Sequence, residues 1–224
     1  ENPDLEEQGR ELAFGAEFVY PNDLLYLRLG HMQIQENFVA GIGFVPRPGV
    51  RESYGEIKVG PRPERWGIMQ IQVGTGIDHI SDFDGRLLTR EWDASPFLIR
   101  FLTGDQVGWK MVSSYELLNE SFSIYEDYII PEGEYSFFWQ TASIHSSQHR
   151  KVWATLDYRF GGFFDGTRNE IKLKAGYKII VPLFLGGELI RNDVTISEED
   201  GFIAYIYRVN LNILFSPDIT LYNF

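Results

Sequence analysis

The alternation of apolar and polar side chains over residues 202–215 constrains the fold more than any other feature of the chain. Successive side chains of a β-strand point to opposite faces, whereas a helix returns to the same face only every third or fourth residue. The run therefore predicts one strand of 14 residues with an apolar face and a mainly polar face. The apolar parity is Ile203, Tyr205, Tyr207, Val209, Leu211, Ile213 and Phe215, and the other is Ala204, Ile206, Arg208, Asn210 and Asn212.

The same pattern recurs along the chain. Residues 150–160 and 171–179 alternate around Asp165-Gly166, and Asp-Gly between two alternating runs is a hairpin signal. No segment keeps a 3.6-residue period and no linker divides the chain, so we predict one all-β domain over 1–224 without substantial helix. Within it, the segment 46–63, which is richer in Pro, Gly and Arg than its surroundings, is predicted as an inserted loop. The remaining strand candidates are 14–20, 24–35, 38–45, 52–59, 69–77, 86–92, 97–103, 107–116, 121–129, 134–145 and 183–196.

Strand length helps to distinguish a sheet that spans a membrane from one in a soluble protein. Strands of globular proteins most often have about 5–6 residues, whereas the runs at 150–160 and 202–215 hold 11 and 14. A transmembrane strand needs about 9–11 residues. Alternation alone leaves two architectures open, because a soluble sandwich turns its apolar face inward and a membrane barrel turns it toward lipid. We predict an antiparallel up-and-down transmembrane β-barrel, whole or partial. The alternative is a soluble β-sandwich or lipocalin-like barrel that binds a small apolar or sugar ligand.

The membrane interpretation assigns a role to each face of the long runs. Asn, Lys, Arg and Asp suit a water-filled lumen, and the opposite face would contact lipid. Aromatic residues near strand ends would form interfacial girdles, for instance Trp66, Trp92, Tyr135, Trp139, Phe163 and Phe164. The predicted lumen-facing residues are Asp157, Arg159, Lys172, Lys174, Arg208, Asn210 and Asn212. The predicted lipid-facing residues are Val152, Leu156, Tyr158, Phe160, Tyr205, Tyr207, Val209 and Leu211.

Charge and composition limit the classes of partner and of chemical site that the chain could have. The chain has 32 acidic and 20 basic residues and a formal net charge of −12, which argues against a nucleic-acid partner. It has no cysteine, which excludes disulfide frameworks, thiolate metal sites and cysteine nucleophiles. On a helix, His145 and His149 would lie on one face and could hold a metal ion together, but they lie in a predicted strand end and turn. We therefore predict no metal site and no cofactor.

No group of residues is singled out as catalytic. A glycoside hydrolase needs two carboxyl groups about 5–9.5 Å apart across a sugar cleft. Acidic neighbours such as Glu6-Glu7 and Glu198-Glu199 are typical of solvated loops instead. The serines lack the strand-to-helix turn of a nucleophile elbow. We predict that the protein is not an enzyme.

The stretch Glu36 to Arg47 resembles a signature, Phe-Asn-Pro-Glu-x-Gly-Phe-x-x-Arg, of a bacterial family. The family comprises outer-membrane proteins of unknown function, in which a C-terminal β-barrel region follows a carbohydrate-binding module of the family 9 type. Phe38, Gly43, Phe44 and Arg47 match, while Val39-Ala40-Gly41 stands in place of Asn-Pro-Glu. Further similarities follow in the same order. They are Arg62-Pro63 before Trp66, the turn from Pro131 to Tyr135, the segment from Gly161 to Gly166, and Phe215-Ser216-Pro217.

The resemblance implies a non-catalytic barrel in the bacterial outer membrane, with the lipid bilayer as its partner. It also implies uptake or surface handling of glycans through a module outside this chain. The family's barrel continues past the Phe-Ser-Pro turn, so the chain is expected to be a fragment of a longer one.

Overall fold

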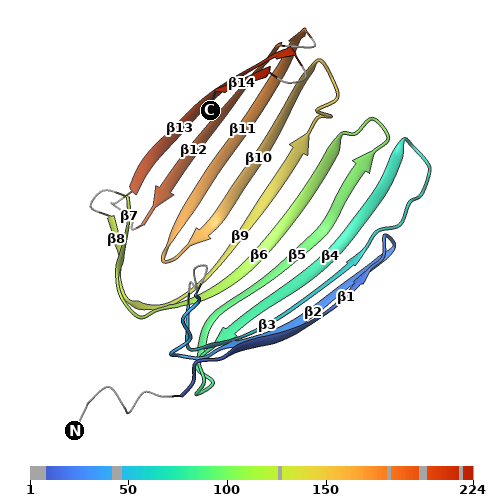
Figure 1. The fold of residues 1–224 in the computed structure, drawn as a ribbon. Helices are drawn as coiled ribbons and strands as arrows, with labels where there is room; N and C mark the ends of the chain where they lie inside the picture. Colours follow the sequence, from blue (N-terminus) through green and yellow to red (C-terminus); the bar gives the residue numbers. More distant parts are fainter. Residues whose placement is uncertain are drawn as a thin grey trace. The chain divides into compact units, whose positions relative to one another are not determined.

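The computed structural model describes residues 9–41, 47–125, 128–180, 183–196, 201–216 and 219–223. These residues form fourteen β-strands and no helix (Figure 1). The strands are β1 (Ala13–Pro21), β2 (Leu25–Ile34), β3 (Val50–Val59), β4 (Ile68–Ser81), β5 (Leu87–Phe101), β6 (Gln106–Leu118), β7 (Phe122–Tyr125), β8 (Tyr128–Ile130), β9 (Gly133–His145), β10 (Val152–Phe163), β11 (Gly166–Ile180), β12 (Leu183–Thr195), β13 (Gly201–Ser216) and β14 (Ile219–Asn223).

Twelve of the described strands are hydrogen-bonded in chain order, from β1 to β6 and on from β9 to β14. The two short strands β7 and β8 pair with each other as a separate hairpin. The prediction of an all-β, antiparallel up-and-down sheet is confirmed. Among the described strands, β1 and β14 stand at the two ends of this order, and no pairing joins them.

Several predicted boundaries differ from the structure. The candidates 86–92 and 97–103 form one strand, β5, which continues through Pro96. The missing amide of Pro96 removes a single hydrogen-bond donor without ending the strand. The candidate 121–129 folds on itself and supplies β7 and β8. The short strand β14 was not predicted.

The segment around the family-like signature is mostly not a strand. Of the candidate 38–45, residues 38–41 belong to no strand, and residues 42–46, with Gly43 and Phe44, lie outside the described residues. The segment 46–63, predicted as an inserted loop, instead contains the whole of β3. Its alternating residues pair with β2 over ten positions, from Leu25 opposite Val59 to Ile34 opposite Val50.

The chain forms two compact units, which we describe separately. Unit 1 comprises Glu1–Val59, Gly74–Asp93 and Ser113–Ser136. Unit 2 comprises Gly60–Val73, Ala94–Val112 and Phe137–Phe224.

The described part of the chain has few buried apolar side chains. In unit 1, Val50, Leu88 and Leu117 form a cluster against which Ile34, Ile80 and Tyr115 pack. In unit 2, Val112 and Val194 are buried. Many large apolar side chains of the strands are exposed instead. None of the described residues lies in a helix long and apolar enough to span a membrane.

Candidate functional site

Strand register in unit 2 separates the side chains into two faces. Along one line across the strands, Leu156 lies opposite Leu173, which lies opposite Leu189 and then Tyr207. One residue further along, Lys174 lies opposite Glu188, which lies opposite Arg208. Because side chains directly opposite each other share a face, the first line belongs to an apolar face and the second to a polar face.

The apolar face of unit 2 carries all eight residues that we predicted to face lipid. The side chains of Tyr207, Val209 and Val152 are 70%, 66% and 63% exposed. Leu156, Tyr158 and Tyr205 are also exposed, whereas Phe160 and Leu211 are half-buried. The rings of Tyr205 and Tyr207 stack on each other with centroids 6.0 Å apart. This face is therefore a continuous apolar surface that no second layer of unit 2's described residues covers.

Unit 1 has an apolar face of the same kind. Phe18 lies opposite Leu29, and Tyr20 opposite Leu27, which in turn lies opposite Ile57. Phe14, Phe18, Tyr20, Leu29, Ile57, Ile77 and Trp92 are all exposed. Leu27, Leu29, Ile57, Ile77 and Trp92 together line a shallow apolar groove.

The polar face of unit 1 contains an acidic pocket of about 250 Å³. The Tyr54 hydroxyl donates a hydrogen bond of 2.6 Å to Glu17 Oε2, and Arg28 Nε donates one of 2.7 Å to the same atom. The Arg28 guanidinium lies 4.6 Å from the centre of the Tyr54 ring. That ring lies over Gly30, where a Cβ would overlap its atoms, so a larger residue there would displace the Tyr54 ring. The carboxyl-bearing residues of the lining are Glu52, Glu56, Asp78, Glu91 and Asp93.

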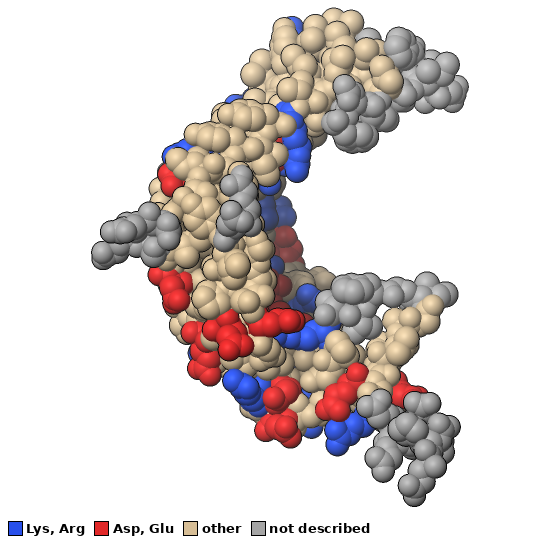
Figure 2. Space-filling view, turned by 90° about the vertical axis from the view of Figure 1, so that its left-hand side faces the viewer, with Lys and Arg blue, Asp and Glu red and all other residues tan. Residues whose placement is uncertain are grey.

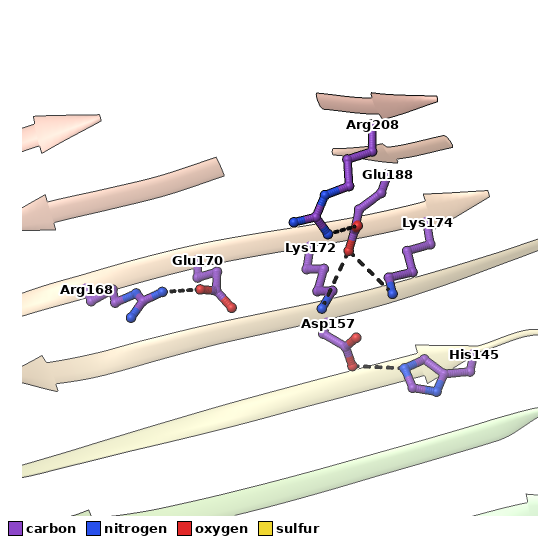
Figure 3. A network of polar contacts seen from close by, with 8 residues as sticks. All are labelled: His145, Asp157, Arg168, Glu170, Lys172, Lys174, Glu188 and Arg208. Carbon is purple, nitrogen blue, oxygen red and sulfur yellow. Dashed lines mark hydrogen bonds and ion pairs between the residues drawn. The ribbon is translucent and has the colours of Figure 1, made fainter. Parts of the chain in front are cut away.

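The polar face of unit 2 contains a network of ion pairs, which we call the polar cluster (Figure 3). Its central member is Glu188 on β12, whose side chain is only 9% exposed. Arg208 Nη1 donates a hydrogen bond of 2.8 Å to Glu188 Oε2. Lys174 Nζ and Lys172 Nζ lie 3.4 and 3.5 Å from Glu188 Oε1. One nearly buried carboxylate thus faces three cations from the two neighbouring strands.

Two further pairs complete the polar cluster. Arg168 pairs with Glu170 on the same strand, and Arg168 Nε donates a hydrogen bond of 2.9 Å to Asn192 Oδ1. His145 Nε2 lies 2.9 Å from Asp157 Oδ1. The members of the polar cluster are therefore His145, Asp157, Arg168, Glu170, Lys172, Lys174, Glu188 and Arg208.

Register places the seven predicted lumen-facing residues on this polar face. Asp157 lies opposite Lys172, and Arg159 lies opposite Glu170. Asn210 and Asn212 follow Arg208 at every second position of β13. The structure adds His145, Arg168, Glu170 and Glu188, which we did not predict. Glu188 lies in Gly186-Gly187-Glu188, where two glycines interrupt the alternation that identified the other strands.

The aromatic residues expected at the membrane interfaces lie in different surroundings. Trp66 and Trp92 are exposed, whereas Tyr135 is buried and donates a hydrogen bond of 2.9 Å to the carbonyl of Pro131. Trp139 lies on the polar face, where the Arg159 guanidinium is 4.2 Å from its ring centre. Phe164 packs against Phe163 and Phe137. Position near a strand end did not distinguish these surroundings. Within a strand, as at Trp92 and Trp139, parity decides which face a ring occupies, whereas Trp66 and Phe164 lie in turns between strands.

Two connections of unit 2 are tied together by Asp105, between β5 and β6. Its carboxylate accepts hydrogen bonds from the Ser147 amide (3.0 Å) and from Arg150 Nη2 (2.5 Å) in the connection between β9 and β10. The Thr103 hydroxyl donates a third, of 2.7 Å. The bonds from Thr103 and Ser147, followed by the charge of Arg150, lower the pKa of Asp105 below its ordinary value.

The net charge is divided unequally between the units. Unit 1 holds 21 acidic and 7 basic residues, a formal charge of 7 − 21 = −14. Unit 2 holds 11 acidic and 13 basic residues, so its charge is 13 − 11 = +2. On the face of the molecule in Figure 2, acidic side chains gather in one region. The acid excess of the whole chain therefore belongs to unit 1.

No group of three or more His, Asp or Glu side chains in the described ranges is arranged to hold a metal ion. Comparisons of the chain with protein-family models, with curated proteins and with solved structures found no match.

Proposed function

We propose that the chain forms the wall of a bacterial outer-membrane β-barrel, with its apolar faces toward lipid and its polar faces toward an aqueous lumen. The observation that carries this proposal is a sheet whose apolar face is exposed along strands of membrane-spanning length. The strands β10 to β13 have 12, 15, 13 and 16 residues. About 9–11 residues are enough to cross a bilayer at the usual tilt.

The distribution of apolar side chains supports lipid as the covering medium. A soluble sandwich buries its apolar faces between two sheets about 10 Å apart. Apart from the twelve-stranded sheet, the described residues form only the β7–β8 hairpin, whose strands have four and three residues. Large exposed apolar surfaces on soluble proteins are rare and mark interaction sites. Acyl chains can cover such a surface over its whole extent.

Closing the barrel requires a partner for each edge of the sheet. Unpaired backbone amide and carbonyl groups are not tolerated in hydrocarbon, so β1 and β14 must each pair with another strand. The edge strand β1 keeps the two-faced pattern, with Phe14 and Phe18 on the apolar side and Glu17 on the polar side. We propose that strands beyond those described complete the barrel.

The proposed role is non-catalytic passage or surface handling of a polar solute. The polar faces present hydrogen-bonding and charged groups that suit a wet lumen. The glycan part of the proposal rests on the resemblance to barrels that follow a carbohydrate-binding module. Under this proposal, any direct sugar binding by that module takes place outside this chain.

Detergent dependence and heat-modifiable gel mobility test the proposal. The chain, expressed with its native flanks, should need detergent or lipid to stay monodisperse. It should also migrate differently in gels before and after boiling, since closed barrels resist unfolding by detergent. A monodisperse protein in detergent-free buffer would overturn the proposal and favour the soluble sandwich or lipocalin-like barrel.

A further inference from the structure

We propose that Lys172, Lys174 and Arg208 form a binding site for an oxyanionic group, a carboxylate or sulfate, of a water-soluble solute. We call these three residues the cationic triad. The inference deepens the proposed function by naming a class of solute, and it rests on that function for the polar face being in contact with water.

The cationic triad carries more positive charge than its surroundings neutralise. The three cations share a single carboxylate, Glu188, so the group has a formal charge of 3 − 1 = +2. Of the neighbouring carboxylates, Glu170 pairs with Arg168. Asp157 lies opposite Lys172 and is hydrogen-bonded to His145, which is charged only when protonated, so counting Asp157 with Glu188 still leaves a formal charge of 3 − 2 = +1. A solute anion would supply the missing negative charge.

The two lysines are close to Glu188 without being tightly bound to it. Both ammonium groups approach the same oxygen, at 3.4 and 3.5 Å, whereas charge-assisted hydrogen bonds from nitrogen measure about 2.7–2.9 Å. An ammonium has three donors, so each lysine keeps donors for a ligand. The side chains of Lys172, Lys174 and Arg208 are 35%, 43% and 58% exposed, and Glu188 lies beneath them.

Arg159 adds to the positive electrostatic potential on the same face. Its guanidinium lies over Trp139, and its Nε is buried without a hydrogen-bond acceptor. Register places Arg159 opposite Glu170, on the strand that carries Lys172 and Lys174. A nearby fixed cation raises the local concentration of anions. The polar face of unit 1 differs, because acidic side chains dominate its pocket.

The test is titration of the folded full chain with sodium sulfate, followed by calorimetry, at an ionic strength held constant with sodium chloride. Lys174→Gln should weaken sulfate binding on the order of tenfold, because it removes one unit charge a few ångströms from the anion. Glu188→Gln should strengthen binding by a similar factor, because it removes the internal competitor. The two variants are expected to change the sulfate affinity in opposite directions. General damage to the fold would weaken binding in both.

Lys178→Gln is the matched control. Lys178 lies on the same strand, β11, but its ammonium donates a hydrogen bond of 2.7 Å to the Gln148 carbonyl. Sulfate affinity should be unchanged in this variant. If Glu188→Gln fails to fold, the sulfate affinities of Lys174→Gln and Lys178→Gln are compared to test the site.

Equal affinities in those two lysine variants would overturn the oxyanion site, as would weaker or unchanged binding in a folded Glu188→Gln variant. Gel mobility and detergent dependence are measured on the same samples. A chain that binds sulfate without needing detergent would refute the barrel and leave the anion site standing.

Discussion

Replacing Val209 by arginine should separate a lipid-facing from a water-facing apolar surface. Val209 lies near the middle of β13, and its cross-strand partner on β12 is Gly187, so an arginine would meet no opposing side chain. Its side chain is already 66% exposed. In a bilayer, arginine near the midplane of a barrel's outer surface costs about 2–4 kcal/mol. On a water-exposed surface the same change costs no more than about 0.5 kcal/mol.

Reversible denaturant unfolding from lipid vesicles measures this difference. We expect Val209→Arg to lower the free energy of unfolding by about 2–4 kcal/mol. The control is Asn210→Arg, on the next residue of the same strand and the opposite face, for which we expect a change within about 0.5 kcal/mol. A small effect at both positions would refute lipid contact. Equal large effects would show that arginine disturbs the strand itself, whichever face it occupies.

Three further predictions follow from individual contacts. Leu117→Ala should lower the unfolding free energy by about 2–5 kcal/mol in denaturant titrations, because Leu117 is buried in the unit 1 cluster; an effect below about 1 kcal/mol would contradict that packing. Folding lowers the pKa of Asp105, so its contact with the Ser147 amide should persist above the ordinary aspartate pKa and disappear as the pH falls through the lowered value. The Ser147 amide should lose its protection from hydrogen exchange in this acid range. The Asp105→Asn variant should remove the pH dependence of that protection. Gly176→Ala should displace Trp153, whose ring occupies the space that the new Cβ would need, and cost about 1–3 kcal/mol; unchanged tryptophan fluorescence and stability would argue against that contact.

The fold class was predictable from the sequence because a period of two is a local property of the chain. Strands such as β10 and β13 carry their alternation in consecutive residues. The Asp165-Gly166 signal predicted the hairpin between β10 and β11, although the turn itself is formed by Phe164 and Asp165, and Gly166 begins β11. Boundaries were less predictable where a local breaker is outweighed by pairing, as at Pro96 inside β5. Pairing of a segment with itself, as in β7 and β8, depends on register that no single run reveals.

The candidate site was predictable in part. Parity identified Lys172, Lys174 and Arg208 as sharing one face, because each lies in a run with clear alternation. Glu188 was missed, because its position between those cations depends on the pairing of β12 with both neighbours. The division of charge between the units was likewise hidden, since each unit is assembled from three separate stretches of chain.

Cysteine scanning of β13 tests most directly whether one face of the sheet meets lipid and the other meets water. The natural chain has no cysteine, so single cysteines at positions 203 to 210 can each carry one fluorescent label. In vesicles, we expect a lipid-borne quencher to act at 203, 205, 207 and 209, and a water-soluble quencher at 204, 206, 208 and 210. Position 206 is the most telling, because Ile206 is apolar and yet lies on the polar face, opposite Ile190. If quenching does not alternate along the strand, or if both quenchers fail to reach the odd positions, then the apolar face of β13 does not contact lipid.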